Sequence, residues 1–233
     1  MPLIFPTHLF NPANIKISLQ GATIVSQPSL SGVGQVLRTD GGGFWVCEMS
    51  GIVLRTPEHV RGWRAWETEL AGGVERIVVP VADIRYAPLA YAGKRIAKPV
   101  QVRTTDVDPF FPASGPYGPN RAIVATVGAA AFRATQLIVT IAKGAPVQSG
   151  STFSINHPTK GRRMYRVGRI LSRNGMSATF NSEPPLREAV NTGTAVDFEW
   201  PSFTAIQVPQ IDISPDLATY GRGEVSIQFR EAL

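Results

Sequence analysis

Residues 44–80 have the sequence FWVCEMSGIVLRTPEHVRGWRAWETELAGGVERIVVP, in which a strand, a helix and a second strand follow one another. At the start, Trp45, Cys47 and Met49 share one side of an extended chain, because successive side chains of a strand point to opposite faces. Residues 75–84 read as the second strand, and Pro80 within it favours a sheet edge or a bulge. The two strands predict a sheet that the helix between them can cover.

The middle of this stretch predicts a helix at about residues 57–71. Thr56 is a suitable N-cap residue, and Pro57 suits the first helical position. Gly72 and Gly73 supply the stop signal that is common after the last turn. Between these signals the apolar residues follow at helical spacing and form one stripe: Val60, Trp63, Trp66 and Leu70. We therefore expect the helix to lie across the sheet and to bury both tryptophans.

Short strand patterns, separated by turn residues, fill most of the remaining chain. The segment at 184–190, PPLREAV, instead suggests a single helical turn. The alternating sequence GEVSIQFR at 223–230 is a strand, and we expect it to pair with the first part of the chain. The fold class is therefore mainly β. We predict a β-sandwich domain of residues 1–100 and 204–233 that carries an inserted small β-barrel of residues 101–203.

The composition excludes several classes of protein and gives no sign of catalysis. With 43% hydrophobic and 17% charged residues over 233 positions, the chain is globular rather than disordered. Its single cysteine, Cys47, excludes an intrachain disulfide and a Cys-rich zinc site. No apolar run approaches the roughly 20 residues of a membrane span, and the N-terminus lacks the basic region of a signal peptide. The histidines are isolated from one another, so we expect no enzyme, no catalytic residue, no metal and no cofactor: His8, His59 and His157.

The positive charge is concentrated in the middle of the chain. The net charge is +6, yet residues 109–182 contain no Asp or Glu and nine basic residues. The basic run KGRRMYRVGRILSR at 160–173 has arginines on both faces of a predicted strand, which is unlike a single binding stripe. Because arginine is enriched at protein interfaces, the candidate subunit-interface or exterior basic surface is Arg162, Arg163, Arg166, Arg169 and Arg173.

Two other functions remain open at this point. The basic barrel could bind nucleic acid, since Tyr165 and Met164 lie between the arginines. Alternatively, Phe110, Phe111 and Tyr117, in the proline-rich loop 104–120, could form a carbohydrate-binding surface.

Three stretches together resemble a known family. They are residues 44–80, then GSTFSINHPTKGRRMYRVGRIL at 150–171 followed by EPPLREAVNTGTAVDFEWP at 183–201, and the closing GEVSIQFREAL at 223–233. In order and residue type they resemble the distal tail protein of bacteriophages with long, non-contractile tails. Some members of that family carry a small, OB-like barrel inserted in the tube-forming domain. Loop 104–120 has no counterpart in the resemblance.

The resemblance implies a structural virion protein without catalytic residues. Such proteins form a hexameric ring at the distal end of the tail, assembled in the host bacterial cytoplasm. The ring connects the tail tube protein to the hub and tip proteins of the host-recognition apparatus, and the tape-measure protein is a further expected partner. DNA passes the lumen without specific binding, so we expect the arginines of 160–173 to face neighbouring subunits or the exterior, because basic side chains in the lumen would retain phosphate.

Overall fold

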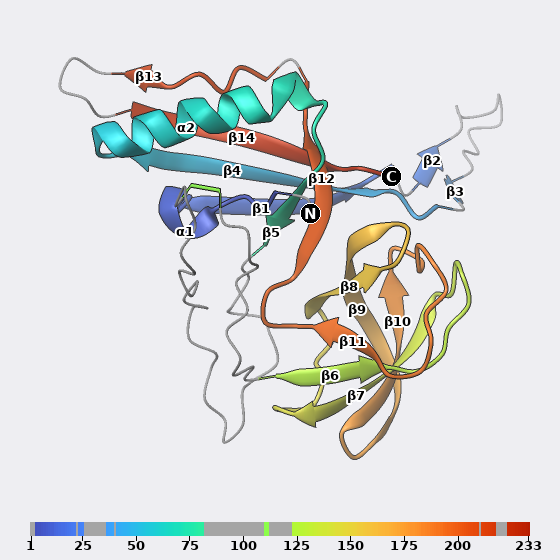
Figure 1. Cartoon of the computed structure of the whole chain (residues 1–233). Coiled ribbons are helices and arrows are strands. Elements are labelled where there is room, and N and C mark those ends of the chain that lie inside the picture. Colours follow the sequence, from blue (N-terminus) through green and yellow to red (C-terminus); the bar gives the residue numbers. More distant parts are fainter. Residues whose placement is uncertain are drawn as a thin grey trace, which may run out of the picture.

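The computed structural model describes residues 3–21, 23–25, 36–39, 41–81, 110–111, 123–209, 211–217 and 223–233. These residues form a twisted sheet with a helix across it and a separate closed barrel below (Figure 1). The predicted fold class, mainly β with a small barrel, is confirmed.

The sheet joins the two ends of the chain. Its order is β1 (Asn14–Gln20), β4 (Phe44–Leu54), β14 (Gly223–Glu231), β12 (Ser202–Gln207) and β5 (Ile77–Pro80), all antiparallel, with the short β13 (Asp216–Leu217) beside β14. β14 lies between β4 and β12, so the closing strand pairs with the first part of the chain, as expected. The outer edge of β5 pairs in turn with the N-terminal segment through a bridge from Ile4 to Val78.

Strand β4 contains a bulge, and the alternation of buried and exposed side chains changes phase there. Between the pairs Val225–Ile52 and Ile227–Met49, β4 advances by one residue more than β14. Gly51 takes up this extra residue with a φ of 69°, a conformation that glycine adopts without steric cost. The bulge shifts by one residue which side chains face the core. Ile52 is therefore buried, although it lies three residues after the buried Met49 and not two or four.

Helix α2 (Pro57–Glu69) covers one face of the sheet, close to its predicted bounds. The Oγ1 atom of Thr56 accepts a hydrogen bond from the backbone N–H of His59 at 3.2 Å, which caps the helix as predicted. Both tryptophans are buried, and the indole N–H of Trp63 donates to the carbonyl of Ile213 at 2.7 Å. Phe5 packs edge-on against both indole rings, within the core between helix and sheet.

The barrel is closed by six strands. They are β6 (Val124–Val127), β7 (Gln136–Lys143), β8 (Thr152–His157), β9 (Gly161–Asn174), β10 (Ser177–Glu183) and β11 (Thr194–Asp197), and their order around the barrel is β10-β7-β6-β11-β8-β9. Alternate residues fill the interior, where Phe153 contacts the rings of Tyr165, Phe180 and Phe198. The barrel therefore has a packed core of its own rather than a central cavity.

The helical turn predicted at 184–190 is wrong. This segment contains no helix, bends at residues 184, 187 and 188, and is bonded to the connection between β6 and β7: the N–H of Leu186 donates to the carbonyl of Ala134, and Val190 forms a bridge with Ala130. Pro184 and Pro185 have no N–H groups, and the N–H groups of Leu186, Arg187 and Val190 donate to the barrel rather than along a helix.

Candidate functional site

The basic run singled out in the sequence forms strand β9, which lies between the two cores. Met164 belongs to the core of the sheet, whereas its neighbour Tyr165 belongs to the core of the barrel. The strand is thus buried on both faces along this part of its length, and it lies against β12 of the sheet. The indole N–H of Trp45 in β4 donates to the carbonyl of Met164 at 2.7 Å, which ties the two β units together.

Three of the five candidate arginines are engaged at this junction. Arg162 donates to Ser202 Oγ in β12 at 3.1 Å and lies 3.7 Å from the carboxylate of Asp197. The guanidinium of Arg166 lies over the ring of Trp45, 4.9 Å from its centroid. Arg163 is only 2% exposed in the single chain, so it forms no part of a subunit-interface or exterior basic surface, contrary to the expectation. Its charge is matched inside the chain, by Glu231.

Glu231 is the centre of this buried cluster. Its side chain has no exposure, and its Oε1 atom lies 3.2 Å from Nη1 of Arg163. Its Oε2 atom lies 3.3 Å from Nη2 of Arg187 and accepts a hydrogen bond from the backbone N–H of Trp45 at 3.1 Å. Arg163 also donates to the carbonyl of Ala232. Burial lowers the pKa of Arg163, and the charge of Glu231 opposes that shift.

A neutral pair continues the cluster into the barrel. The hydroxyl oxygen of Tyr165 accepts a hydrogen bond from the backbone N–H of Arg187 at 3.0 Å and lies 2.8 Å from Nε2 of His157. Burial lowers the pKa of His157 to about 4, so the imidazole is neutral at pH 7. The cluster therefore links the end of β14, strand β9, strand β8 and the segment after β10.

Sequence reasoning missed Glu231 and Arg187, although one signal was present. Val225, Ile227 and Phe229 alternate along β14 on its buried face, and Glu231 continues the same face. An acid in phase with buried apolar residues must find a cation, since a charge is rarely buried alone. No pattern in the sequence indicated which arginines would meet it.

The remaining two arginines lie on the far half of β9. Both Arg169 and Arg173 are exposed, and Arg173 donates to the carbonyl of Val147 at 2.5 Å. The basic surface available to an outside partner is therefore smaller than the sequence indicated. Because the engaged arginines bind groups of the chain itself, they are not free to contact phosphate in this arrangement.

The aromatic residues of the carbohydrate hypothesis are packed on the helix where the structure describes them. The ring of Phe111 stacks on Trp66 at 4.9 Å, and Phe110 stacks on Phe10 at 6.0 Å. The carbonyl of Phe110 accepts a hydrogen bond from the indole N–H of Trp66 at 2.8 Å. Both phenylalanines thus extend the core, while Tyr117 and the rest of loop 104–120 lie outside the described residues.

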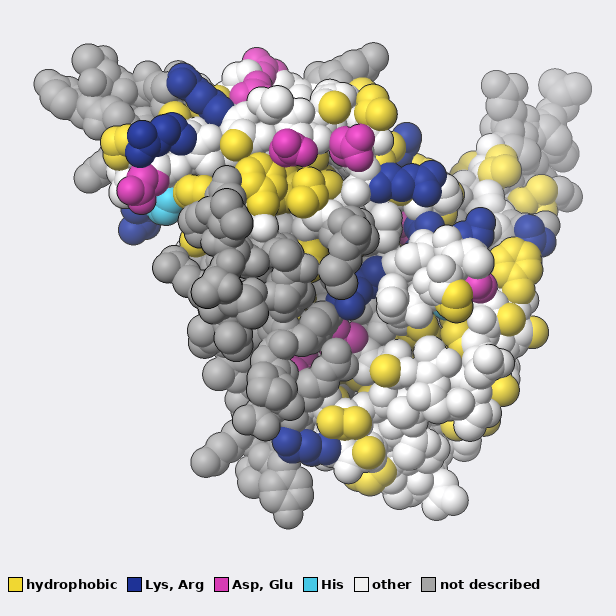
Figure 2. All heavy atoms as spheres, viewed as in Figure 1, with side chains coloured by type: hydrophobic (Ala, Val, Ile, Leu, Met, Phe, Trp, Pro, Cys, Tyr) yellow, Lys and Arg dark blue, Asp and Glu magenta, His cyan; other side chains and the backbone are white. Residues whose placement is uncertain are grey.

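A hairpin with two apolar faces projects beyond the end of the sheet (Figure 1). It consists of β2 (Thr23–Val25) and β3 (Val36–Arg38), which pair only with each other among the described strands. Ile24 lies opposite Leu37, and Val25 lies opposite Val36, so each pair occupies a different face. All four side chains are 59–69% exposed, and Figure 2 shows hydrophobic groups at the upper right, where Figure 1 places the hairpin.

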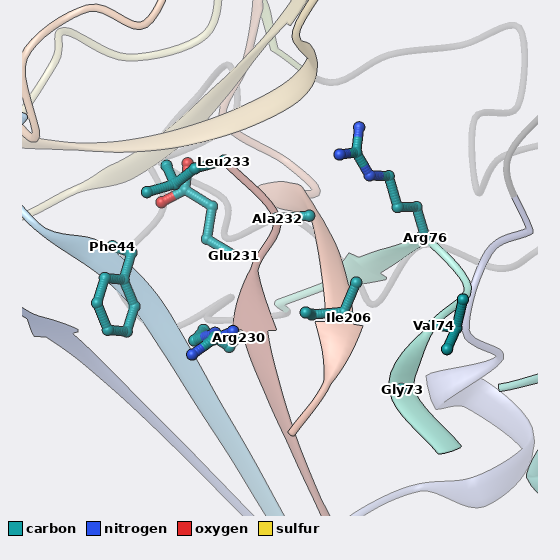
Figure 3. A pocket seen from close by; sticks show the side chains of 9 residues that line it. All are labelled: Phe44, Gly73, Val74, Arg76, Ile206, Arg230, Glu231, Ala232 and Leu233. Carbon is teal, nitrogen blue, oxygen red and sulfur yellow. The ribbon is translucent and has the colours of Figure 1, made fainter. Parts of the chain in front are cut away.

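A groove opens on the sheet beside the barrel (Figure 3). Its volume is about 450 Å³, and the side chains of Arg76 and Arg230 flank it. The guanidinium of Arg230 lies over the ring of Phe44, 5.7 Å from its centroid. No buried polar atom without a partner, among those of the described residues, belongs to the side chains that line it. The lining residues are Phe44, Gly73, Val74, Arg76, Ile206, Arg230, Glu231, Ala232 and Leu233.

Within the described part of the chain, no cluster of His, Cys, Asp or Glu could hold a metal ion. None of the described helices has the length and apolar character to cross a membrane. Cys47 is buried in the core of the sheet, where burial raises its pKa to about 12. A scan against protein-family models finds no match, and a search of curated proteins finds none.

Proposed function

We propose that this chain is a structural subunit of an oligomeric ring, and specifically a distal tail protein of a long-tailed bacteriophage. In this proposal six copies form the ring at the far end of the tail tube and connect the tube to the hub and tip proteins. The resemblance of residues 44–80, 150–201 and 223–233 to that family supports the proposal. The exposed hairpin supplies the physical reason for assembly.

The observation that carries the proposal is the apolar character of both hairpin faces. A two-stranded ribbon is at best marginally stable alone in water, and most hairpins bury one face on a core. Here Ile24 and Leu37 are exposed on one face while Val25 and Val36 are exposed on the other. An assembly that covers both faces would bury this area, and each fully covered side chain contributes about 1.5–3 kcal/mol.

The engaged arginines support a scaffold more than a nucleic-acid binder. Arg162, Arg163 and Arg166 each bind groups of the sheet or the barrel at the junction. A binder that depended on strand β9 would need these charges at its surface. We therefore expect the wild-type chain to leave duplex DNA unretarded in a gel at low salt, and DNA can then pass a ring of such subunits without being held.

The ring is tested by negative-stain microscopy and light scattering of the purified chain. We expect six-fold rings with an open centre, and a mass that corresponds to six copies. Replacing Ile24→Glu together with Leu37→Glu should leave a folded monomer, because both side chains are solvent-exposed in the single chain.

The matched control is Ile138→Glu on the barrel, where an equally apolar side chain is 52% exposed. This variant should still form rings. A wild-type chain that remains monomeric at every concentration tested refutes the proposal, as does ring formation that is unaffected by the paired hairpin substitutions.

A further inference from the structure

The barrel contacts the base of the exposed hairpin at three points. All three lie in residues 183–187, which we call the bracket segment. First, Glu183 at the end of β10 forms an ion pair of 3.1 Å with Arg38 at the end of β3. This pair is half-exposed, so alone it contributes little to stability. Its importance is its position, because it joins the barrel directly to a hairpin strand.

The second contact is made by Arg187. Its Nη1 atom donates to the carbonyl of Gly41 and its Nη2 atom donates to the carbonyl of Gly43, each at 2.5 Å. These glycines connect β3 to β4, so they are the point at which the hairpin returns to the sheet. The same guanidinium is held in place by Glu231. A planar guanidinium with several donors can bridge such a set of acceptors in a fixed orientation.

The third contact is steric. Gly42 lies directly against Pro185, so that a Cβ atom built on Gly42 would come within 2.1 Å of the Cδ atom of Pro185. Gly42 also has a φ of 65°, which disfavours any side chain. The connection between β3 and β4 therefore fits the bracket segment only with glycine at this position.

From these contacts we propose that the barrel positions the hairpin, and that the bracket segment is the part that does so. Among the described strands, β2 and β3 pair only with each other. At their base the hydroxyl of Thr39 donates to the carbonyl of Gly21 at 2.9 Å, which closes the hairpin on the end of β1, and the contacts with the bracket segment come from the barrel side. That the hairpin is a subunit contact rests on the proposed function, whereas the positioning itself is a property of the single chain. The inserted barrel is then a requirement for assembly, because it presents both apolar faces in one orientation.

The experiment measures the orientation of the hairpin within one chain, with doubly labelled chain diluted into an excess of unlabelled chain so that distances between subunits do not contribute. Leu37→Cys on the hairpin and Val53→Cys on β4 are exposed sites for spin labels, whereas the native Cys47 is buried. The distance distribution between the two labels is recorded by pulsed electron paramagnetic resonance. We expect one narrow peak in the parent chain.

Gly42→Ala should broaden or displace this peak, because the new methyl group forces the connection away from Pro185. Gly72→Ala is the matched control: its φ of 67° gives the same backbone strain, but nothing lies within 4 Å of the added Cβ atom. This control should leave the peak unchanged. Pro185→Ala removes the clashing ring atoms, so the double variant with Gly42→Ala should restore a peak as narrow as that of the parent.

A broad distribution in the parent chain, or an unchanged peak in Gly42→Ala, overturns the proposal. If Gly42→Ala does not fold, the test is made with Pro185→Ala alone. This substitution removes the packing on Gly42, so it should broaden the distance peak, and an unchanged peak refutes the positioning. If the distance peak is unchanged in both Gly42→Ala and Pro185→Ala and the chain still forms rings, the positioning by the barrel is refuted and the proposed ring is not. A positioned hairpin on a chain that never oligomerises would refute only the ring.

Discussion

Removing the carboxylate of Glu231 should strongly destabilise the junction between the sheet and the barrel. Its side chain is fully buried and accepts bonds from two guanidiniums and from the backbone of Trp45. The substitution Glu231→Ala leaves Arg163 and Arg187 with two positive charges close together and no anion between them. Arg163 is itself almost fully buried, so water cannot replace the lost partner without opening the junction.

The expected cost follows from the behaviour of buried ion pairs. Deleting one partner of such a pair typically lowers the free energy of unfolding by about 3–5 kcal/mol. For a chain of this length, each kcal/mol corresponds to a shift of roughly 2–4 °C in Tm, so the midpoint should fall by about 6–20 °C. Glu231→Gln should cost less, because its amide oxygen can still accept a hydrogen bond from one guanidinium.

Urea denaturation followed by tryptophan fluorescence measures this cost. The control is Glu183→Ala, which breaks an ion pair whose two side chains are about half exposed, and which should change the free energy of unfolding by no more than about 1 kcal/mol. A loss of less than 1 kcal/mol for Glu231→Ala would refute the reasoning, because it would mean that the cluster is hydrated. Such a result would also mean that Glu231 does not hold the guanidinium of Arg187 in place.

Two further predictions concern buried titratable groups. His157 has a folded pKa of about 4, below its ordinary value of 6.5, so the unfolded state binds more protons between these values. Stability from this group is complete above pH 6.5 and is lost as the pH falls towards 4, by about 1–2 kcal/mol at pH 5. His157→Asn should show a smaller loss in urea titrations at pH 7 and pH 5, and an equal loss in both chains would contradict this assignment. Burial raises the pKa of the Cys47 thiol to about 12, so the thiol should resist alkylation by iodoacetamide in the native chain and react in urea. Mass spectrometry measures the extent of labelling. Rapid labelling of the native chain would contradict this prediction and show that the core of the sheet opens readily.

Local patterns allowed the helix and most strands to be predicted from sequence. The Thr56 cap and the tryptophan stripe are local signals, and both act as predicted. The stop signal is offset by one residue, because the C-cap is Leu70 and Ala71, with a φ of 46°, follows it before Gly72. The error at 184–190 has the opposite origin. Its helix-forming residues are outweighed by hydrogen bonds to the connection between β6 and β7, which lies some fifty residues earlier in the chain. A tertiary partner of that kind leaves no trace in a window of seven residues.

The candidate site was predicted in part, for a related reason. The density of arginines in residues 160–173 correctly marked an unusual strand, but composition does not distinguish an exposed surface from a junction between two cores. The distinction depends on what lies against the strand, and here Trp45 and Glu231 come from the beginning and the end of the chain. The hairpin lies among the short strand patterns of the sequence, and only the structure shows that apolar side chains on both of its faces are exposed.

The way in which strand β9 is buried explains why its arginines alternate on both faces. A strand with one core usually alternates apolar and polar residues, and its charges then share one side. β9 instead contributes Tyr165 to the barrel and Met164 to the sheet, so both faces meet protein and both need their charges matched. Arg163 forms an ion pair with Glu231. Arg162 donates to Ser202 and lies beside the carboxylate of Asp197, and Arg166 lies over the ring of Trp45. The excess of positive charge in the middle of the chain is therefore in part the means by which the barrel is fixed to the sheet, and through Arg187 the same cluster reaches the base of the hairpin.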